Sequence, residues 1–272
     1  MSSSFNDNLT EQLPLSGAKI LVTGVANQHS IAAGCAQAYV RAGAEVGLTY
    51  LNDKARFHVK TVADAVDAAF LCPYDARVPV TADGVFEEIG RTWGHVDHVL
   101  HSIAYCPLTD LLEPLHECSQ EGFLEAMEIT CYSLVDLARR SAAIMPKNGS
   151  ITTVSYLGGQ RVLPDYNVMA PVKAALEATV RTLAYELGPR GIRVHALSPG
   201  PMDTRAASGL EDFDRTMERA RQVAPLRRLA SPEDVGSFAA FLAGPGASAT
   251  TGNVHFVDGG LHVMGWDDGD PC

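Results

Sequence analysis

Short β-rich runs alternate with helix-like stretches along nearly the whole chain, and this alternation constrains the fold more than any other feature. The β-rich runs occur at 19–23, 45–50, 70–72, 96–102, 150–155, 193–198 and 253–257. Helical periodicity occurs at about 30–42, 53–68, 85–93, 119–145, 168–187, 206–222 and 232–243. Such alternation is typical of a parallel sheet covered by helices on both faces. The sequence therefore predicts an α/β fold, a single doubly wound, Rossmann-like domain with a seven-stranded parallel sheet.

No internal repeat, linker or change of composition divides the chain. We expect one domain over residues 15–265, with loose tails at 1–14 and 266–272. Hydrophobic residues make up 46% and charged residues 19%, which excludes a disordered chain or a coiled coil. No uncharged run supplies the roughly 18 apolar residues of a membrane span. Residues 1–10 have neither a basic region nor an apolar core, so we expect no signal peptide and a cytoplasmic location.

The charge and the metal-binding residue types also exclude several kinds of partner. A net charge of -11 argues against binding to nucleic acid or to an anionic membrane. The six cysteines are scattered, with no CxxC pair, so we expect them to be reduced. His98 and His101 lie three residues apart in a strand-like run, which places them on opposite faces. We therefore expect no metal site, because metal ligands must converge.

The turn after the first predicted strand is the expected place for phosphate binding, because helix N-termini present free N–H groups. The usual GxGxxG spacing is absent. Gly24 allows a tight exit from the strand, and Ser30 can cap the helix, which starts near Ile31, and donate to a phosphate. Gly34 permits close packing of helix on sheet. Ser30 and Gly34 could equally be an ordinary cap and an ordinary packing glycine.

The ends of the second and third predicted strands bear on the choice of cofactor. No acidic residue ends the second strand to hold a ribose hydroxyl, and no arginine there favours a 2′-phosphate; the segment runs from Thr49 to Lys54. Asp75, after the third strand, is a candidate adenine contact. These residues favour NADH over NADPH.

Tyr166 and Lys173 form the candidate catalytic pair. A separation of seven residues on a helix returns to nearly the same face, which places Lys173 beside Tyr166. A nearby ammonium lowers the pKa of a phenol and can bind ribose hydroxyls. A tyrosine so placed can donate a proton or stabilise an oxyanion. An amphipathic helix with a surface lysine would show the same spacing, so the pair alone is weak evidence.

Several motifs accompany this pair in a fixed order. They are Gly24-x5-Ser30-Ile31-Ala32, His101-Ser102-Ile103-Ala104, Ser155-Tyr156-Leu157-Gly158, Pro164-x-Tyr166-Asn167-Val168-Met169-x3-Lys173, Gly200-Pro201-x2-Thr204-x-Ala206-Ala207-Ser208-Gly209 and Val257-Asp258-Gly259-Gly260. Together they resemble the enoyl-acyl-carrier-protein reductases of bacterial fatty acid synthesis, within the short-chain dehydrogenase/reductase superfamily. The resemblance covers about residues 15–264.

The resemblance implies a mechanism and a set of site residues. Hydride from NADH reaches the β-carbon of a trans-2-enoyl thioester, and Tyr166 stabilises the resulting enolate. Lys173 holds the cofactor ribose, and Tyr156 lies against the acyl chain or assists the proton step. The implied substrate contacts are Cys106, Tyr156 and Tyr166. The implied cofactor contacts are Gly24, Ser30, Ile31, Leu51, Asp75, Ala76, Ile103, Lys173, Met202, Asp203, Thr204, Arg205 and Ala206.

The position four residues before Lys173 separates this chain from ordinary short-chain dehydrogenases, which carry tyrosine there. Here it is Met169, whose thioether cannot donate a proton. This disfavours an alcohol or ketone dehydrogenase that acts through that position. Pro171 lies between Tyr166 and Lys173 and is tolerated only in the first turn of a helix.

Two alternatives stay open at this stage: a reductase of another activated alkene or a carbonyl, and a nucleotide-binding regulator without turnover. The resemblance implies a small-molecule acyl thioester as substrate, with acyl carrier protein as a candidate partner. It also implies a homotetramer.

Overall fold

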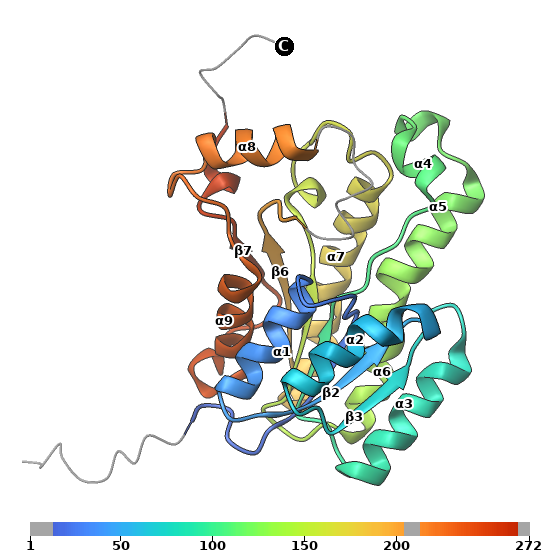
Figure 1. Cartoon of the computed structure of the whole chain (residues 1–272), viewed down its shortest axis with the longest axis vertical. Helices are drawn as coiled ribbons and strands as arrows, with labels where there is room; N and C mark the ends of the chain where they lie inside the picture. Colours follow the sequence, from blue (N-terminus) through green and yellow to red (C-terminus); the bar gives the residue numbers. More distant parts are fainter. Residues whose placement is uncertain (1–12, 204–212, 266–272) are drawn as a thin grey trace, which may run out of the picture.

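A seven-stranded parallel sheet forms the centre of the molecule, in the order β3-β2-β1-β4-β5-β6-β7 (Figure 1). The computed structural model describes residues 13–203 and 213–265. The strands are β1 (Lys19–Thr23), β2 (Glu45–Tyr50), β3 (Phe70–Pro73), β4 (His98–His101), β5 (Ser150–Val154), β6 (Arg193–Pro199) and β7 (Val254–Val257). All neighbouring pairs are parallel, which confirms the predicted fold class. The predicted tails lie almost entirely outside the described residues.

Helices cover both faces of this sheet. They are α1 (Ile31–Arg41), α2 (Asp53–Ala65), α3 (Pro79–Thr92), α4 (Leu108–Leu112), α5 (Gln120–Met127), α6 (Ser133–Ile144), α7 (Met169–Leu187), α8 (Phe213–Val223) and α9 (Pro232–Ala243). Alternate residues of β1 enter two cores: Ile20 and Val22 pack with α1, α2 and α9, whereas Leu21 packs with α3, α6 and α7. Within the described residues, no helix is both long and apolar enough to cross a bilayer.

The single long helix predicted over 119–145 is wrong, because a π-helical segment, η2 (Glu128–Tyr132), separates α5 from α6. The Ser133 hydroxyl donates to the carbonyl of Ile129 (2.6 Å) inside this segment. The Thr130 hydroxyl accepts from the backbone N–H of Tyr105 (3.1 Å). Because of this wider turn, the hydroxyls of Ser133 and Thr130 point toward β4 and the chain that follows it. Such π-helical segments often occur near functional sites.

Other boundaries differ from the prediction by a few residues. Helix α2 ends at Ala65 rather than Ala68, and α3 begins at Pro79 rather than Val85. Proline is favoured in a first helical turn because a backbone N–H there would have no partner within the helix, so proline loses no hydrogen bond. The sequence prediction overlooked this signal at Pro79. The same rule is met in α7, where Pro171 occupies the first turn of a helix that starts at Met169.

Gly34 serves a different contact from the predicted helix–sheet packing. A Cβ atom on Gly34 would lie 2.4 Å from the carbonyl oxygen of Pro232 in α9, and one on Gly236 would lie 2.4 Å from the carbonyl oxygen of Gly34. The two glycines thus let the backbones of α1 and α9 touch. A packing glycine can be recognised in the sequence, but the element that packs against it cannot.

We expect Gly34→Ala to destabilise the protein by about 1–3 kcal/mol, because the new methyl group must displace backbone atoms. Gly84→Ala is the matched control, since Gly84 lies within α3 and has nothing within 4 Å of its would-be Cβ. There alanine should be neutral or stabilising by up to about 1 kcal/mol. Urea unfolding of both variants measures the difference, and equal stability of the two would contradict the packing described.

Candidate active site

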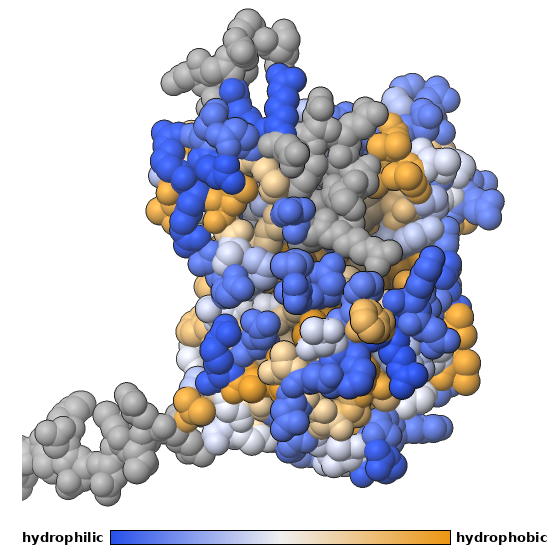
Figure 2. Space-filling view, in the orientation of Figure 1, coloured by the Kyte–Doolittle hydropathy of each residue, from blue (hydrophilic) through white to orange (hydrophobic). Residues whose placement is uncertain are grey.

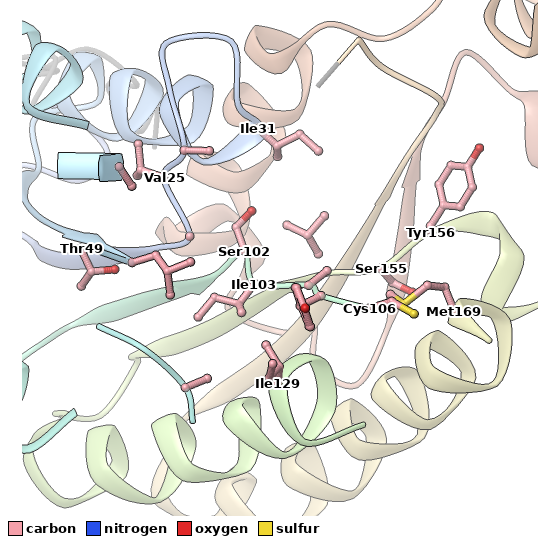
Figure 3. Close-up of a pocket in the computed structure, with 18 of the residues that line it drawn as sticks. Val25, Ile31, Thr49, Ser102, Ile103, Cys106, Ile129, Ser155, Tyr156 and Met169 are labelled. Carbon is pink, nitrogen blue, oxygen red and sulfur yellow. The ribbon is translucent and has the colours of Figure 1, made fainter. Parts of the chain in front are cut away.

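A cavity of about 860 Å³ opens at the carboxyl ends of the strands. It lies beside β1 and β4, where the strand order reverses, which is the usual ligand position in doubly wound sheets. Gly24, with φ of 81°, leaves β1 in a left-handed conformation, and a Cβ there would lie 1.9 Å from the carbonyl oxygen of Ser102. Only glycine permits this approach. Figure 3 shows side chains of several different elements around the cavity, Ile31, Ser102 and Tyr156 among them.

Ser30 begins α1, as predicted. Its hydroxyl oxygen accepts from the N–H of Ala33 (3.3 Å), and its proton is donated to the carbonyl of Asn27 (2.8 Å). Its capping role is confirmed. Ser30 does not line the cavity, however, and its contact with a phosphate stays a prediction.

Most of the predicted cofactor contacts meet in this cavity. Those that line it are Gly24, Ile31, Leu51, Asp75, Ala76, Ile103, Lys173 and Met202. Asp203 is described but is not part of the lining. Thr204, Arg205 and Ala206 lie outside the described residues.

Asp75 already has a partner at the far end of the cavity. Its carboxylate accepts from the Arg77 guanidinium at 3.0 and 3.1 Å, and this bond holds the pKa of Asp75 below its usual range. Arg77 also lines the cavity and pairs with Glu125 at 3.4 Å. Arg77 follows β3, whereas the sequence argument about a cofactor phosphate concerned only the residues after β2, so this arginine was missed. The carboxylates of Asp75 and Glu125 both pair with Arg77 and neutralise part of its positive charge.

Tyr166 lies in the turn before α7 rather than on the helix, so the helical-face argument that paired it with Lys173 is wrong. Asp165 and Asn167 on either side have φ of 60° and 39°. Asp and Asn tolerate this left-handed region better than other non-glycine residues. The Asn167 side chain donates to the carbonyl of Leu111 (2.8 Å), which ties the turn to α4. Two strained residues and a side-chain anchor thus determine the position of Tyr166.

The ring of Tyr166 packs against two neighbours. Its centroid lies 5.0 Å from that of Tyr156 at an interplanar angle of 58°. A Cβ on Gly158 would lie 2.2 Å from the Tyr166 ring, so the glycine lets the ring fit against the backbone. Burial, followed by the effects of Tyr156 and Glu177, raises the pKa of Tyr166 above its usual value. The predicted lowering of this pKa by lysine is therefore wrong, and Tyr166 remains a protonated hydrogen-bond donor at neutral pH.

Lys173 reaches the same cavity from the second turn of α7. It is 5% exposed, and its ammonium donates to the carbonyl of Val154 (2.7 Å) at the end of β5. Burial lowers its pKa to about 8. Met169, four residues earlier, lines the cavity with an apolar thioether (Figure 3). Tyr156, Tyr166 and Lys173 are thus the three predicted catalytic residues that the fold brings together.

Cys106 lines the part of the cavity toward α4. Burial raises the pKa of its thiol to about 12, so the thiol stays protonated and acts there as a small apolar group. Its predicted role as a substrate contact is compatible with this position.

The sequence prediction missed several residues that the fold places at the site. The additional lining residues include Thr49, Asn52, Tyr74, Ser102, Tyr105, Ile129 and Ser155. Glu177, just behind the lining, was missed as well. Its signal was present in the sequence: Glu177 follows Lys173 by one helical turn, among the buried apolar residues Val172, Leu176 and Val180.

The two histidines considered as metal ligands have separate partners. His98 contacts the Ser150 hydroxyl at 2.9 Å. His101 contacts the hydroxyls of Thr153 and Ser133, both at 2.7 Å. Since Ser133 donates its proton to a carbonyl, His101 must donate from Nε2 and accept at Nδ1. Across the described parts of the chain, no three side chains of His, Cys, Asp or Glu come together as a metal site would require.

Comparison with known proteins agrees with this geometry. The sequence model of the family described as Enoyl-(Acyl carrier protein) reductase matches residues 24–262. The NADH-dependent enoyl-acyl-carrier-protein reductase of Salmonella typhimurium is 40% identical over 255 residues, which covers 93% of this chain and 97% of that protein. The crystal structure of the corresponding enzyme of Aquifex aeolicus has a TM-score of 0.89 and 40% identity, and covers 93% and 99% of the two chains.

A further crystal structure, of the reductase from Anaplasma phagocytophilum in complex with NAD, has a TM-score of 0.90 and 38% identity. It covers 94% of this chain and 98% of that one. Both the family and the fold class expected from the sequence are confirmed. The chain belongs to the enoyl-acyl-carrier-protein reductase family.

Proposed function

We propose that this protein reduces trans-2-enoyl thioesters with NADH, as in fatty acid biosynthesis. One observation carries the proposal: Tyr156, Tyr166 and Lys173 line one cavity, with Met169 at the position where ordinary short-chain dehydrogenases carry tyrosine. The phenol is therefore displaced from the place that serves alcohol and ketone chemistry. A displaced donor suits conjugate reduction, in which charge develops on an oxygen three bonds away from the carbon that receives hydride.

The cavity fits a dinucleotide cofactor. It runs from Leu51 and Asp75 past Gly24 to Lys173, and Gly24 lets the chain leaving β1 lie directly against the backbone of Ser102 beside the cavity. We assign the adenine end to Leu51, Asp75 and Ala76 and the ribose near the reacting centre to Lys173. NADH supplies the hydride when bound. The NADH-dependent relatives and the NAD complex of the Anaplasma enzyme support this choice.

The residues of this chain then have separate roles. Tyr166 donates a hydrogen bond to the thioester oxygen as enolate charge develops, and its raised pKa keeps that proton in place. Lys173 orients the ribose with its ammonium group, which a hydrogen bond to the carbonyl of Val154 holds at the end of β5. Tyr156 packs at a tilt against the ring of Tyr166 and bounds the acyl chain. Cys106, Met169 and Ile129 exclude water from the reacting carbons.

An NADH oxidation assay tests the function directly. We expect turnover with crotonyl thioesters and much less with cyclohexenone or a panel of ketones. Ketone turnover above thioester turnover would favour a carbonyl reductase instead. NADH binding without turnover of any compound would indicate a nucleotide-binding regulator.

We also propose that the protein is a homotetramer in the cytoplasm. Among the described residues, no strand pairs with the outer side of β7 at the edge of the sheet, and Phe241 on the neighbouring α9 is half exposed. An uncovered strand edge beside an exposed aromatic favours pairing with another copy. The five cysteines within the described residues are free thiols, which is typical of a reducing compartment. A monomeric mass in light scattering would contradict the assembly.

The surface beside the site favours little discrimination between carriers of the acyl group. Helix α8 is strongly hydrophilic (Figure 2), and its described cations include Arg221, which pairs with Glu218. Glu211, Asp212 and Asp214 precede or begin it, and two of them lie outside the described residues. These acids at the start of α8 would repel an acidic carrier protein.

We therefore expect kcat/KM for carrier-protein and coenzyme A thioesters of one acyl chain to agree within about tenfold, equivalent to roughly 1.4 kcal/mol. Measurements at low and high salt decide the matter. A hundredfold preference for the carrier protein that disappears in high salt would show a basic docking patch.

A further inference from the structure

Glu177 is a buried carboxylate behind the proposed active site. It lies on α7 one turn after Lys173 and is 2% exposed. One oxygen accepts from the Ser155 hydroxyl (2.6 Å) and the other from the Gln160 amide (2.7 Å). A buried charge is costly unless it is hydrogen-bonded and balanced, so its retention here requires a reason.

The two donors to Glu177 bracket the segment that carries Tyr156. Ser155 directly precedes Tyr156, and Gln160 follows η3 (Leu157–Gly159). Between them, Gly158 supports the ring of Tyr166. The would-be Cβ of Gly159 lies only 3.1 Å from Glu177 Oε1, so the segment rests directly on the carboxylate. Glu177 therefore ties both ends of this segment to the helix that carries Lys173.

The negative charge of Glu177 also stabilises the positive charge of Lys173. The ammonium of Lys173 donates to a neutral carbonyl, that of Val154, which cannot balance its charge. Burial lowers the pKa of Lys173, and Glu177 opposes that effect more than the next contributor, Cys131. The other titratable groups around this centre are His101, whose own pKa Lys173 helps to lower, and the two tyrosines.

We propose that Glu177 is a positioning residue for the proposed reduction: it fixes the Tyr156 segment on α7 and supplies the buried negative charge that balances the Lys173 ammonium. This inference rests on the proposed function for its kinetic consequences. Its electrostatic part depends only on NADH binding, so the two can fail separately.

Two variants separate the charge from the tether. Glu177→Gln removes the charge but keeps both hydrogen bonds, because the Gln160 amide can rotate to accept from the new amide group. Gln160→Leu removes one tether and keeps the charge, and Gln160 is exposed, where substitutions usually change stability little. Glu177→Asp keeps the charge on a shorter side chain and serves as the conservative rescue.

The measurement is NADH affinity, by fluorescence titration, from pH 6 to pH 10. A lysine that binds as an ammonium loses its contribution as pH rises through its pKa, so wild-type affinity should fall above about pH 8. In Glu177→Gln the fall should move to lower pH by roughly one unit, because removal of a nearby opposite charge lowers a lysine pKa. Gln160→Leu and Glu177→Asp should keep the wild-type midpoint. Kcat of Gln160→Leu should fall at all pH values alike.

A midpoint for Glu177→Gln that coincides with that of wild type overturns the proposal, as does a loss of affinity that is uniform with pH. Thermal unfolding of each variant at pH 6 confirms that the fold is retained. If Glu177→Gln does not fold, a shifted midpoint in Glu177→Asp would overturn the proposal on its own. If wild-type protein binds NADH but reduces no thioester, the proposed function fails while the test of Glu177 stands.

Discussion

Tyr166→Phe should lower kcat for an enoyl thioester by about 100-fold or more, with little change in NADH affinity. The phenol is the donor that meets the developing enolate oxygen, and loss of one such donor typically costs a factor of about 10²–10³. The ring itself stays packed between Tyr156 and Gly158, so the variant should fold normally. Steady-state kinetics and an NADH titration measure the two effects separately.

Tyr185→Phe is the matched control for this substitution. Tyr185 lies on the same helix, α7, but is 84% exposed and remote from the cavity lining. Its loss of a hydroxyl should leave kcat unchanged. Near-normal turnover by Tyr166→Phe would show that another group stabilises the enolate, and the mechanism proposed above would then be wrong.

Lys173→Ala should weaken NADH binding by about 10- to 100-fold and reduce kcat/KM by at least the same factor. Hydrogen bonds from charged donors contribute about 1.5–3 kcal/mol, which corresponds to that range. In contrast to Tyr166→Phe, the defect should appear already in the binding titration without substrate. The opposite pattern, with intact binding and lost turnover, would assign Lys173 to proton transfer rather than to the ribose.

Lys173→Met controls for the space that alanine leaves behind. Lys173 is almost fully buried, so truncation creates a cavity that could destabilise α7 by itself. Methionine preserves most of the stem but removes the charge and the bond to Val154. We expect the Lys173→Met variant to bind NADH as weakly as the Lys173→Ala variant but to unfold at a higher temperature. Recovery of NADH affinity in the Met variant would show that packing, not charge, is what Lys173 contributes.

Local signals in the sequence were sufficient for the architecture. The β-rich runs Lys19–Thr23 and Glu45–Tyr50 identified strands that the structure reproduces residue for residue. Gly24 and Ser30 marked the first turn, because a left-handed exit and a helix cap each demand particular residue types at one position. Met169 before Lys173 separated the candidate chemistry from that of ordinary dehydrogenases.

The arrangement of the catalytic groups was beyond such signals. The sequence paired Tyr166 with Lys173 by helical spacing, yet the structure places Tyr166 in a turn between two left-handed residues. The same two side chains line one cavity for a different reason: the turn is anchored to α4, and α7 begins at Met169, which leaves Pro171 in its first turn. Both residues were expected at one site and both line the cavity, but the local geometry behind that expectation was wrong.

What the sequence determined by itself is therefore the order and kind of the elements, because periodicity and backbone demands act within a few residues. The tertiary structure alone decided which distant groups touch: Gly34 on the backbone of α9, Ser155 and Gln160 on the carboxylate of Glu177, and His101 on Ser133 at the start of α6. These contacts join residues far apart in the chain, and their energies depend on burial, which no local pattern specifies. Burial also reversed the expected direction of the Tyr166 pKa, since desolvation of the phenolate outweighed any effect of lysine.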